Sequence, residues 1–234
     1  MNVLITGGSR GIGKAIAIEL AKAGHNILIV ARDKSNLKFA LNEINKVSNS
    51  LNISFNCDVS KVDEQLLLLK FCKENNFLPD VLILNAGIFI EGSLLLPKNN
   101  AFENTLNVNF FSNYHLVNLF LDTLKSALSA KIILIGSTAA YEPYPIGSLY
   151  GVSKWALRGY AVNLRNEMMK ENIAVTFIAP GGTLTDLWAG ETLPENRLLE
   201  PSDIGKLIAA ILTLSNQAVV EELIVRPMLG DIHE

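Results

Sequence analysis

Tyr150 and Lys154 lie four residues apart, in the segment Tyr150-Gly151-Val152-Ser153-Lys154. On a helix this spacing places both side chains on one face, one turn apart. A phenol has a reference pKa of about 10, and a neighbouring ammonium group lowers that pKa because it favours the phenolate. The pair can therefore exchange a proton with an alcohol or carbonyl oxygen.

Ser137 stands thirteen residues before Tyr150 and follows the apolar run 131–135 and Gly136. If the run is a strand of a parallel sheet, Ser137 faces the crevice where ligands bind. Its hydroxyl can then donate a hydrogen bond to an oxygen that gains negative charge. Reduction of a ketone by hydride transfer leaves an alkoxide that needs a proton. These three side chains suit that task, with a nicotinamide as the hydride carrier.

Glycines cluster between the first apolar run and the first helical stretch, in Thr6-Gly7-Gly8-Ser9-Arg10-Gly11-Ile12-Gly13. Glycine permits a tight turn and lets backbone N–H groups approach a pyrophosphate, to which the helix N-terminus adds partial positive charge. The turn therefore predicts a dinucleotide site.

The end of the second apolar run indicates which dinucleotide binds. An acidic residue there binds the ribose 2′-hydroxyl and selects NAD. This chain has Ala31 instead, followed by Arg32, a planar cation suited to a 2′-phosphate. Arg10 adds a second cation. Asp33 could take the acidic role from two positions further on, so NAD(H) is the disfavoured alternative to NADP(H).

The elements that must position these residues alternate along the chain. Near-continuous apolar runs, typical of strands buried on both faces, predict strands at 2–6, 26–31, 52–56, 81–84, 131–135, 174–179 and 222–225. Helical stretches are predicted at 11–23, 34–47, 62–75, 101–128, 148–170 and 203–214. This alternation predicts an α/β fold, a seven-stranded parallel sheet with helices on both faces, in one doubly wound Rossmann domain over residues 1–234. The irregular segment at about 182–201 is expected to be a substrate lid.

The glycine turn and the Tyr-x-x-x-Lys pair resemble the short-chain dehydrogenase/reductase family, and further motifs extend the resemblance over nearly the whole chain. These are Cys57-Asp58-Val59, Leu84-Asn85-Ala86-Gly87, Asn107-Val108-Asn109 and Pro180-Gly181-Gly182-Thr183-Leu184-Thr185. The family more often has Val or Ile where this chain has Thr183.

The resemblance implies four catalytic residues, Asn109, Ser137, Tyr150 and Lys154, with Asn109 holding a water near the lysine. It implies cofactor contacts from Gly7, Ser9, Arg10, Gly11, Ile12, Gly13, Ala31, Arg32, Asp58, Val59, Asn85, Ala86, Gly87, Tyr150, Lys154, Pro180, Gly181, Thr183 and Thr185. Simpler roles stay open: Asn109 as a plain helix residue, Asp58 and Asn85 as turn stabilisers, and Thr185 as the cap of a short helix.

Composition excludes several classes of function. The net charge is −3 without a Lys/Arg run, so we expect no nucleic-acid partner. The longest apolar run, 81–90, is too short to span a bilayer, and the start of the chain has no targeting pattern. Cys57 and Cys72 fit reduced thiols in the cytoplasm. The histidines lack ligand spacing, so we expect no metal.

The predicted function is therefore NADP(H)-dependent reduction of a small or medium-sized carbonyl compound, or oxidation of the alcohol. The expected pocket walls are apolar and aromatic: Phe89, Ala139, Tyr144, Ile146, Leu187 and Trp188. A 3-ketoacyl-(acyl carrier protein) reductase ranks second, because the lid has only one basic residue, Arg197, for an acidic carrier. A non-catalytic NADP-binding sensor ranks below it.

The two long helical stretches, 101–128 and 148–170, carry more apolar surface than one sheet face can cover. Examples are Phe110, Phe111, Leu116, Trp155 and Tyr160. Members of the family pair through these two helices, so we expect a homodimer or homotetramer.

Overall fold

The computed structural model describes residues 1–95, 99–144 and 147–231. Its strands form one parallel sheet in the order β3-β2-β1-β4-β5-β6-β7. The strands are β1 (Asn2–Thr6), β2 (Asn26–Ala31), β3 (Asn52–Asn56), β4 (Val81–Leu84), β5 (Lys131–Ile135), β6 (Ala174–Pro180) and β7 (Glu222–Val225). The expected seven-stranded parallel sheet is confirmed.

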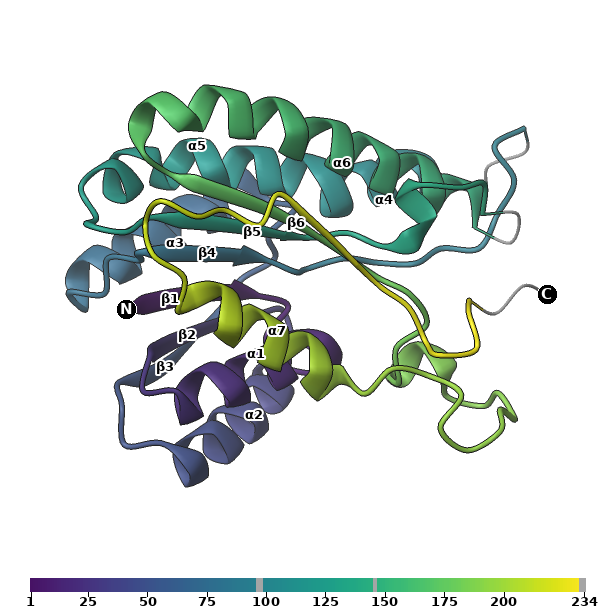
Figure 1. Cartoon of the computed structure of the whole chain (residues 1–234), viewed down its shortest axis with the longest axis horizontal. Helices are drawn as coiled ribbons and strands as arrows, with labels where there is room; N and C mark the ends of the chain where they lie inside the picture. Colours follow the sequence, from purple (N-terminus) through teal and green to yellow (C-terminus); the bar gives the residue numbers. More distant parts are fainter. Residues whose placement is uncertain (96–98, 145–146, 232–234) are drawn as a thin grey trace.

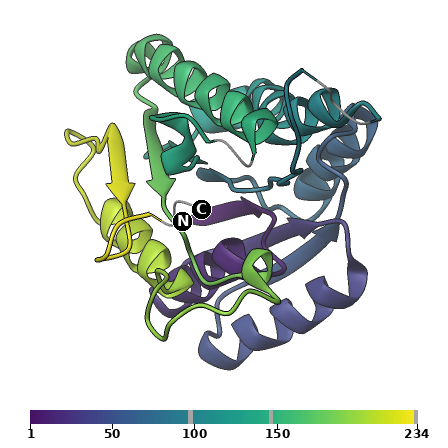
Figure 2. The ribbon, with the colours of Figure 1, turned by 90° about the vertical axis from the view of Figure 1, so that its right-hand side faces the viewer.

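Helices cover both faces of this sheet (Figures 1 and 2). They are α1 (Gly11–Lys22), α2 (Lys34–Val47), α3 (Val62–Glu74), α4 (Ala101–Leu106), α5 (Ser112–Lys125), α6 (Ser148–Met168) and α7 (Pro201–Leu212). Helices α1, α2 and α7 pack against one face, and α3, α5 and α6 against the other.

The core consists of two apolar layers, one on each side of the sheet. Successive strand residues point to opposite faces, so Leu4 packs toward α3, α5 and α6, whereas Val3 and Ile5 pack toward α1 and α7. Complete burial of such a side chain contributes about 1.5–3 kcal/mol. This two-sided burial explains why the strands read as continuous apolar runs rather than as alternating patterns.

The chain reverses its direction of travel across the sheet between β1 and β4. From β1 it moves outward to β3, then returns to β4 on the other side of β1 and continues to β7. In a doubly wound sheet, the carboxyl ends of the strands at this switch point open a crevice for ligands. Here that crevice lies beyond Thr6 and Leu84.

The predicted helix 101–128 is interrupted. It consists of α4, a π-helical turn at Asn107–Phe111, and α5. Two side chains satisfy carbonyls within the widened turn: the Ser112 hydroxyl donates to the Val108 oxygen at 2.6 Å, and Asn113 Nδ2 donates to the Asn109 oxygen at 2.8 Å. Such turns occur often at functional sites, and apolar periodicity does not reveal them.

The ends of several other helices and strands differ from the predicted ends by a few residues. Strand β6 includes Pro180, and α6 ends at Met168 in a 3-10 turn. The last helix begins at Pro201 rather than at residue 203, because proline is well suited to the first position of a helix. No helix within the described ranges is both long and apolar enough to cross a membrane.

The expected lid emerges after β6 and extends past the carboxyl ends of the strands (lower right in Figure 1). Its two ends are joined by backbone hydrogen bonds, from Leu184 N to Leu199 O at 2.9 Å and from Leu199 N to Gly182 O at 2.9 Å. A 3-10 turn, Asp186–Trp188, lies between them.

Candidate active site

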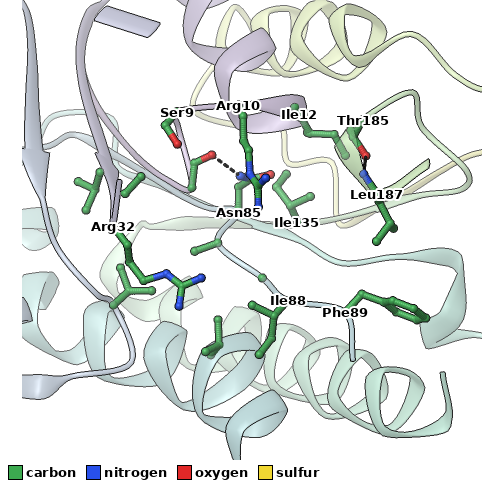
Figure 3. Close-up of a pocket in the computed structure, with 18 of the residues that line it drawn as sticks. Ser9, Arg10, Ile12, Arg32, Asn85, Ile88, Phe89, Ile135, Thr185 and Leu187 are labelled. Carbon is green, nitrogen blue, oxygen red and sulfur yellow. Dashed lines mark hydrogen bonds between the residues drawn. The ribbon is translucent and has the colours of Figure 1, made fainter. Parts of the chain in front are cut away.

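A cleft of about 650 Å³ lies at the carboxyl edge of the sheet, between the glycine turn, the start of α6 and the part of the expected lid at residues 185–187 (Figure 3). The predicted cofactor residues that line it are Gly7, Ser9, Arg10, Gly11, Ile12, Ala31, Arg32, Asp58, Val59, Asn85, Ala86, Gly87, Tyr150, Lys154 and Thr185. Four others, Gly13, Pro180, Gly181 and Thr183, lie outside this lining. Most of the residues predicted from separate motifs thus meet around one cavity.

The glycine turn has the form of an anion site. Gly7 and Gly11 adopt positive φ angles of 66° and 52°, which are strained for other residues. Gly13 supports the turn from behind, because a Cβ there would overlap the Gly7 carbonyl oxygen. The first turn of α1 holds no acidic residue, and Arg10 makes no side-chain cap. The uncapped N–H groups and the helix dipole therefore suit the pyrophosphate of a dinucleotide.

Asn85 connects the end of β4 to this turn. Its Nδ2 donates to the Thr6 oxygen at 3.0 Å and to the Gly7 oxygen at 3.3 Å, while the Thr6 hydroxyl accepts from Asn85 N and Ala86 N, each at 3.0 Å. Asn85 therefore stabilises the turn, and it also lines the cleft.

The charged residues near the end of β2 differ in their partners. Asp33 caps α2, since its Oδ1 accepts from Asn36 N at 2.7 Å. Arg32 reaches the cavity from the strand end (Figure 3), and no hydrogen bond or ion pair within the described part of the chain engages its guanidinium. Arg10 extends from the glycine turn and forms an ion pair with Asp186 of the lid, Nη1 to Oδ2, at 3.1 Å.

Two further predicted contacts also serve local structure. Asp58 Oδ1 accepts from Ser60 N at 3.0 Å and from its hydroxyl at 2.7 Å, which stabilises the turn after β3. The Thr185 hydroxyl caps the 3-10 turn by accepting from Leu187 N at 3.4 Å (Figure 3). The simpler roles considered for both residues are thus observed, and both still line the cleft.

Tyr150, Lys154 and Ser137 meet where α6 begins. Lys154 is buried, donates to the Ile135 oxygen at 3.1 Å, and has its Nζ 5.4 Å from the centre of the Tyr150 ring. The Ser137 hydroxyl accepts from Ala139 N at 3.2 Å and lowers the pKa of the Tyr150 phenol, although Ser137 itself lies outside the cleft lining. A helix turn and a strand end thus place a phenol, an ammonium and a hydroxyl together, as their spacing predicted.

Burial shifts the two titratable groups of this trio toward their neutral forms, so the pKa of Tyr150 is raised and not lowered as its spacing from Lys154 predicted. It raises the pKa of Tyr150 to about 12, against a lowering effect of the Ser137 hydrogen bond and a further increase from Tyr144. Burial also lowers the pKa of Lys154 to about 8. At neutral pH the phenol therefore retains its proton, and most of the lysine is still charged.

Asn109 is completely buried beneath the same region, in the π-helical turn. Its Oδ1 accepts from Ile88 N at 2.8 Å, and its Nδ2 donates to Ile88 O at 3.0 Å and to the Ser153 hydroxyl at 2.9 Å. Ser153 in turn donates to the Tyr150 carbonyl at 2.7 Å. Asn109 therefore links the loop after β4 to the helix that carries Tyr150 and Lys154, while its side chain stays outside the cavity lining.

Other residues line the cleft that were not among the predicted cofactor contacts. They are Val30, Asp33, Asn36, Cys57, Ile88, Phe89, Val108, Ile135, Gly136, Asp186 and Leu187. Cys57 and Val108 stand inside motifs quoted above, and most of the others adjoin a motif residue in sequence, which is the signal that could have located them. Of the expected pocket walls, Phe89 and Leu187 line the cavity, Ala139, Tyr144 and Trp188 do not, and Ile146 lies outside the described residues.

Two aromatic side chains, Phe89 and Tyr144, lie near the Tyr150 ring. The Phe89 ring centre lies 5.5 Å from that of Tyr150 and 6.1 Å from that of Tyr144.

In the described part of the chain, no group of three or more His, Cys, Asp or Glu side chains could hold a metal ion.

Comparison with known proteins identifies related sequences along the whole chain. A family model described as short chain dehydrogenase matches residues 1–196. The sepiapterin reductase of Chlorobaculum tepidum is 28% identical, over 99% of this chain and 98% of its own length. Carbonyl reductase family member 4 of Xenopus laevis is 29% identical, over 89% of each chain.

Solved structures agree. An alcohol dehydrogenase from Thermococcus sibiricus, complexed with 5-hydroxy-NADP, superimposes with a TM-score of 0.90 at 26% identity, covering 99% of this chain and 98% of the other. A metagenomic short-chain oxidoreductase in complex with NADP has a TM-score of 0.84 at 30% identity, covering 98% of each chain.

Proposed function

Because this chain belongs to the short-chain dehydrogenase family and is an oxidoreductase, we propose that it uses NADP(H) to reduce a small or medium-sized carbonyl compound, or to oxidise the corresponding alcohol. One observation carries the proposal. Tyr150 and Lys154, whose Nζ lies 5.4 Å from the centre of the Tyr150 ring, line the same cleft as the glycine turn. The relatives named sepiapterin reductase and carbonyl reductase support reduction of a carbonyl group.

In the proposed reaction, bound nicotinamide supplies or accepts the hydride. Ser137 donates a hydrogen bond to the substrate oxygen, and Tyr150 gives that oxygen its proton during reduction or removes it during oxidation. The charged Lys154 stabilises the phenolate that remains after reduction. Asn109 keeps the loop after β4 against the helix that carries both groups. Phe89 lies against Tyr150 and limits the access of water.

The preference for NADP(H) rests on charge at the end of β2. Arg32 is available for a 2′-phosphate, and Asp33, the residue that could have favoured NAD(H), is committed to the cap of α2. The NADP-containing complexes of two similar structures support this preference. The cofactor residues proposed on the phosphate side are thus the glycine turn and Arg32, with Asp58, Val59 and residues 85–87 on the adenosine side.

The lid favours a small substrate over a carrier-bound one. A carrier protein presents acidic groups, which require free basic groups at the entrance. Arg197, the single basic residue of the lid, already donates to the Gly230 oxygen at 2.8 Å and to the Asp231 oxygen at 3.0 Å. Arg226, close by, is paired with Glu142 and Asp231. These contacts support a free carbonyl compound as the substrate.

We also propose that residues 1–234 act as one cofactor-binding and catalytic domain, with 182–201 as its lid, in a cytoplasmic homo-oligomer. Both cysteines are free thiols, which supports a reducing compartment. The face of α5, α6 and the preceding π-helical turn, which we name the paired-helix face, exposes Phe111, Tyr114, Val152, Trp155 and Val162. Of the residues expected there, Leu116 is buried in the core instead. A solution mass above one 25.6 kDa chain would support the assembly.

A decisive test follows NADPH oxidation by the purified chain with a panel of ketones. We expect turnover with at least one ketone, and its loss by about 10²-fold or more in Tyr150→Phe, because the proton donor is missing. Tyr141→Phe removes a phenol that pairs with Glu222 instead and serves as the matched control. Tight NADPH binding without turnover on any ketone would favour the sensor, and normal turnover of Tyr150→Phe would exclude this proton donor.

A further inference from the structure

The cleft contains an acidic side chain whose place is unexpected for a site that binds a polyanion. Among the lining residues, Asp33 and Asp58 accept hydrogen bonds from neighbouring backbone, as described above. Asp186 comes from the lid and pairs with Arg10, across a sequence separation of 176 residues. Its carboxylate therefore engages one of the two cations proposed to bind the cofactor's 2′-phosphate.

The lid lies directly on the glycine turn at this point. A Cβ on Gly11 would come within 3.1 Å of the Thr185 Cγ2, so Thr185 packs against the turn next to Arg10. The 3-10 turn that begins at Asp186 is held by the Thr185 hydroxyl. Asp186 and Arg10 are thus brought together by the packing of the Thr185 side chain against Gly11.

The ion pair is weak enough to be exchanged. The side chains of Arg10 and Asp186 are 68% and 67% exposed, and pairs of this kind in water typically change an equilibrium by only about 1.4- to 5-fold. A phosphate monoester carries up to two negative charges and accepts a bidentate contact from arginine, so it competes well with one carboxylate oxygen.

From this arrangement we propose that Asp186 is a specificity-determining residue that competes with the 2′-phosphate of NADP(H) for Arg10. The inference rests on the proposed use of NADP(H). In this proposal the 2′-phosphate of NADP(H) displaces Asp186 from Arg10, whereas NAD(H), which has no 2′-phosphate, leaves the pair intact. The pair therefore reduces the preference for NADP(H) below the level that Arg10 and Arg32 would set together. Because Asp186 belongs to the lid, the contact between the lid and the glycine turn then depends on which cofactor is bound.

The test measures dissociation constants of NADPH and NADH by titrating cofactor fluorescence at low salt. Asp186→Asn should tighten NADPH binding by about 1.4- to 5-fold relative to NADH binding, because Arg10 no longer has a competing partner. Raising the salt concentration to about 1 M should abolish the difference. Glu191→Gln is the matched control, since Glu191 is an exposed lid acid outside the cleft lining, without an ion pair among the described residues.

A double-mutant cycle separates the possible outcomes. In an Arg10→Ala background, Asp186→Asn should leave NADPH binding unchanged, because the competition requires both partners. Weaker NADPH binding in Asp186→Asn, an equal gain for NADH, or a gain matched by Glu191→Gln would each overturn the inference. If the unmodified chain binds NADH as tightly as NADPH, the proposed cofactor preference itself fails. A clear NADPH preference that Asp186→Asn does not change rejects only the role of Asp186.

Discussion

The charge of Lys154 provides the sharpest pH prediction. Burial lowers its pKa to about 8, while that of Tyr150 is raised to about 12. Only the lysine therefore titrates between pH 6 and 10 within this pair. Lysine is charged below its pKa, and a charged Lys154 attracts the anionic cofactor and stabilises the phenolate. Activity should accordingly be constant at pH 6–7 and decrease as the pH rises through about 8.

The size of the effect follows from the same pKa. With a pKa of about 8, roughly nine-tenths of Lys154 is charged at pH 7 and roughly one-tenth at pH 9, a tenfold decrease. The appropriate measurement is kcat/KM for NADPH at saturating ketone, because this quantity reports ionisations of the enzyme before NADPH binds. Lys154→Met should remove most of the activity and the pH dependence together. A flat profile from pH 6 to 9, or the same decrease in Lys154→Met, would refute the role assigned to this ammonium group.

Three other predictions concern selectivity, the π-helical turn and assembly. Arg32→Ala should raise the KM for NADPH about ten- to a hundredfold and leave that for NADH nearly unchanged, since one charge-assisted contact is lost; equal efficiency of the unmodified chain with both cofactors would contradict this. Asn113→Leu should lower the free energy of unfolding by about 1–3 kcal/mol, because the buried Asn109 carbonyl loses its donor. Asn118→Leu removes a similar bond on an exposed face, and a comparable loss there would refute a special role of the turn. Trp155→Lys should reduce the mass measured by light scattering to one chain, and an unchanged oligomer would place the interface elsewhere.

Much of the fold could be predicted because its signals are local. Buried parallel strands need apolar residues on both faces, so runs such as 131–135 are visible without any knowledge of their neighbours. The π-helical turn could not be predicted in this way. Its existence depends on side-chain bonds from Ser112 and Asn113 to nearby carbonyls, and these residue types also occur in ordinary helices.

In the candidate site, too, local features could be predicted from the sequence and long-range contacts could not. Glycine, Tyr and Lys at fixed spacing specify a turn and a helix face, so the sequence by itself determined the glycine turn, the Tyr150–Lys154 pair and the family resemblance. Only the tertiary structure decided which charges meet. It placed Asp186 on Arg10, Asp33 on the cap of α2 and Asn109 beneath the start of α6. The pairing of Arg10 with Asp186 depends on how the lid packs against the glycine turn, and no spacing rule along the chain encodes a contact over that distance.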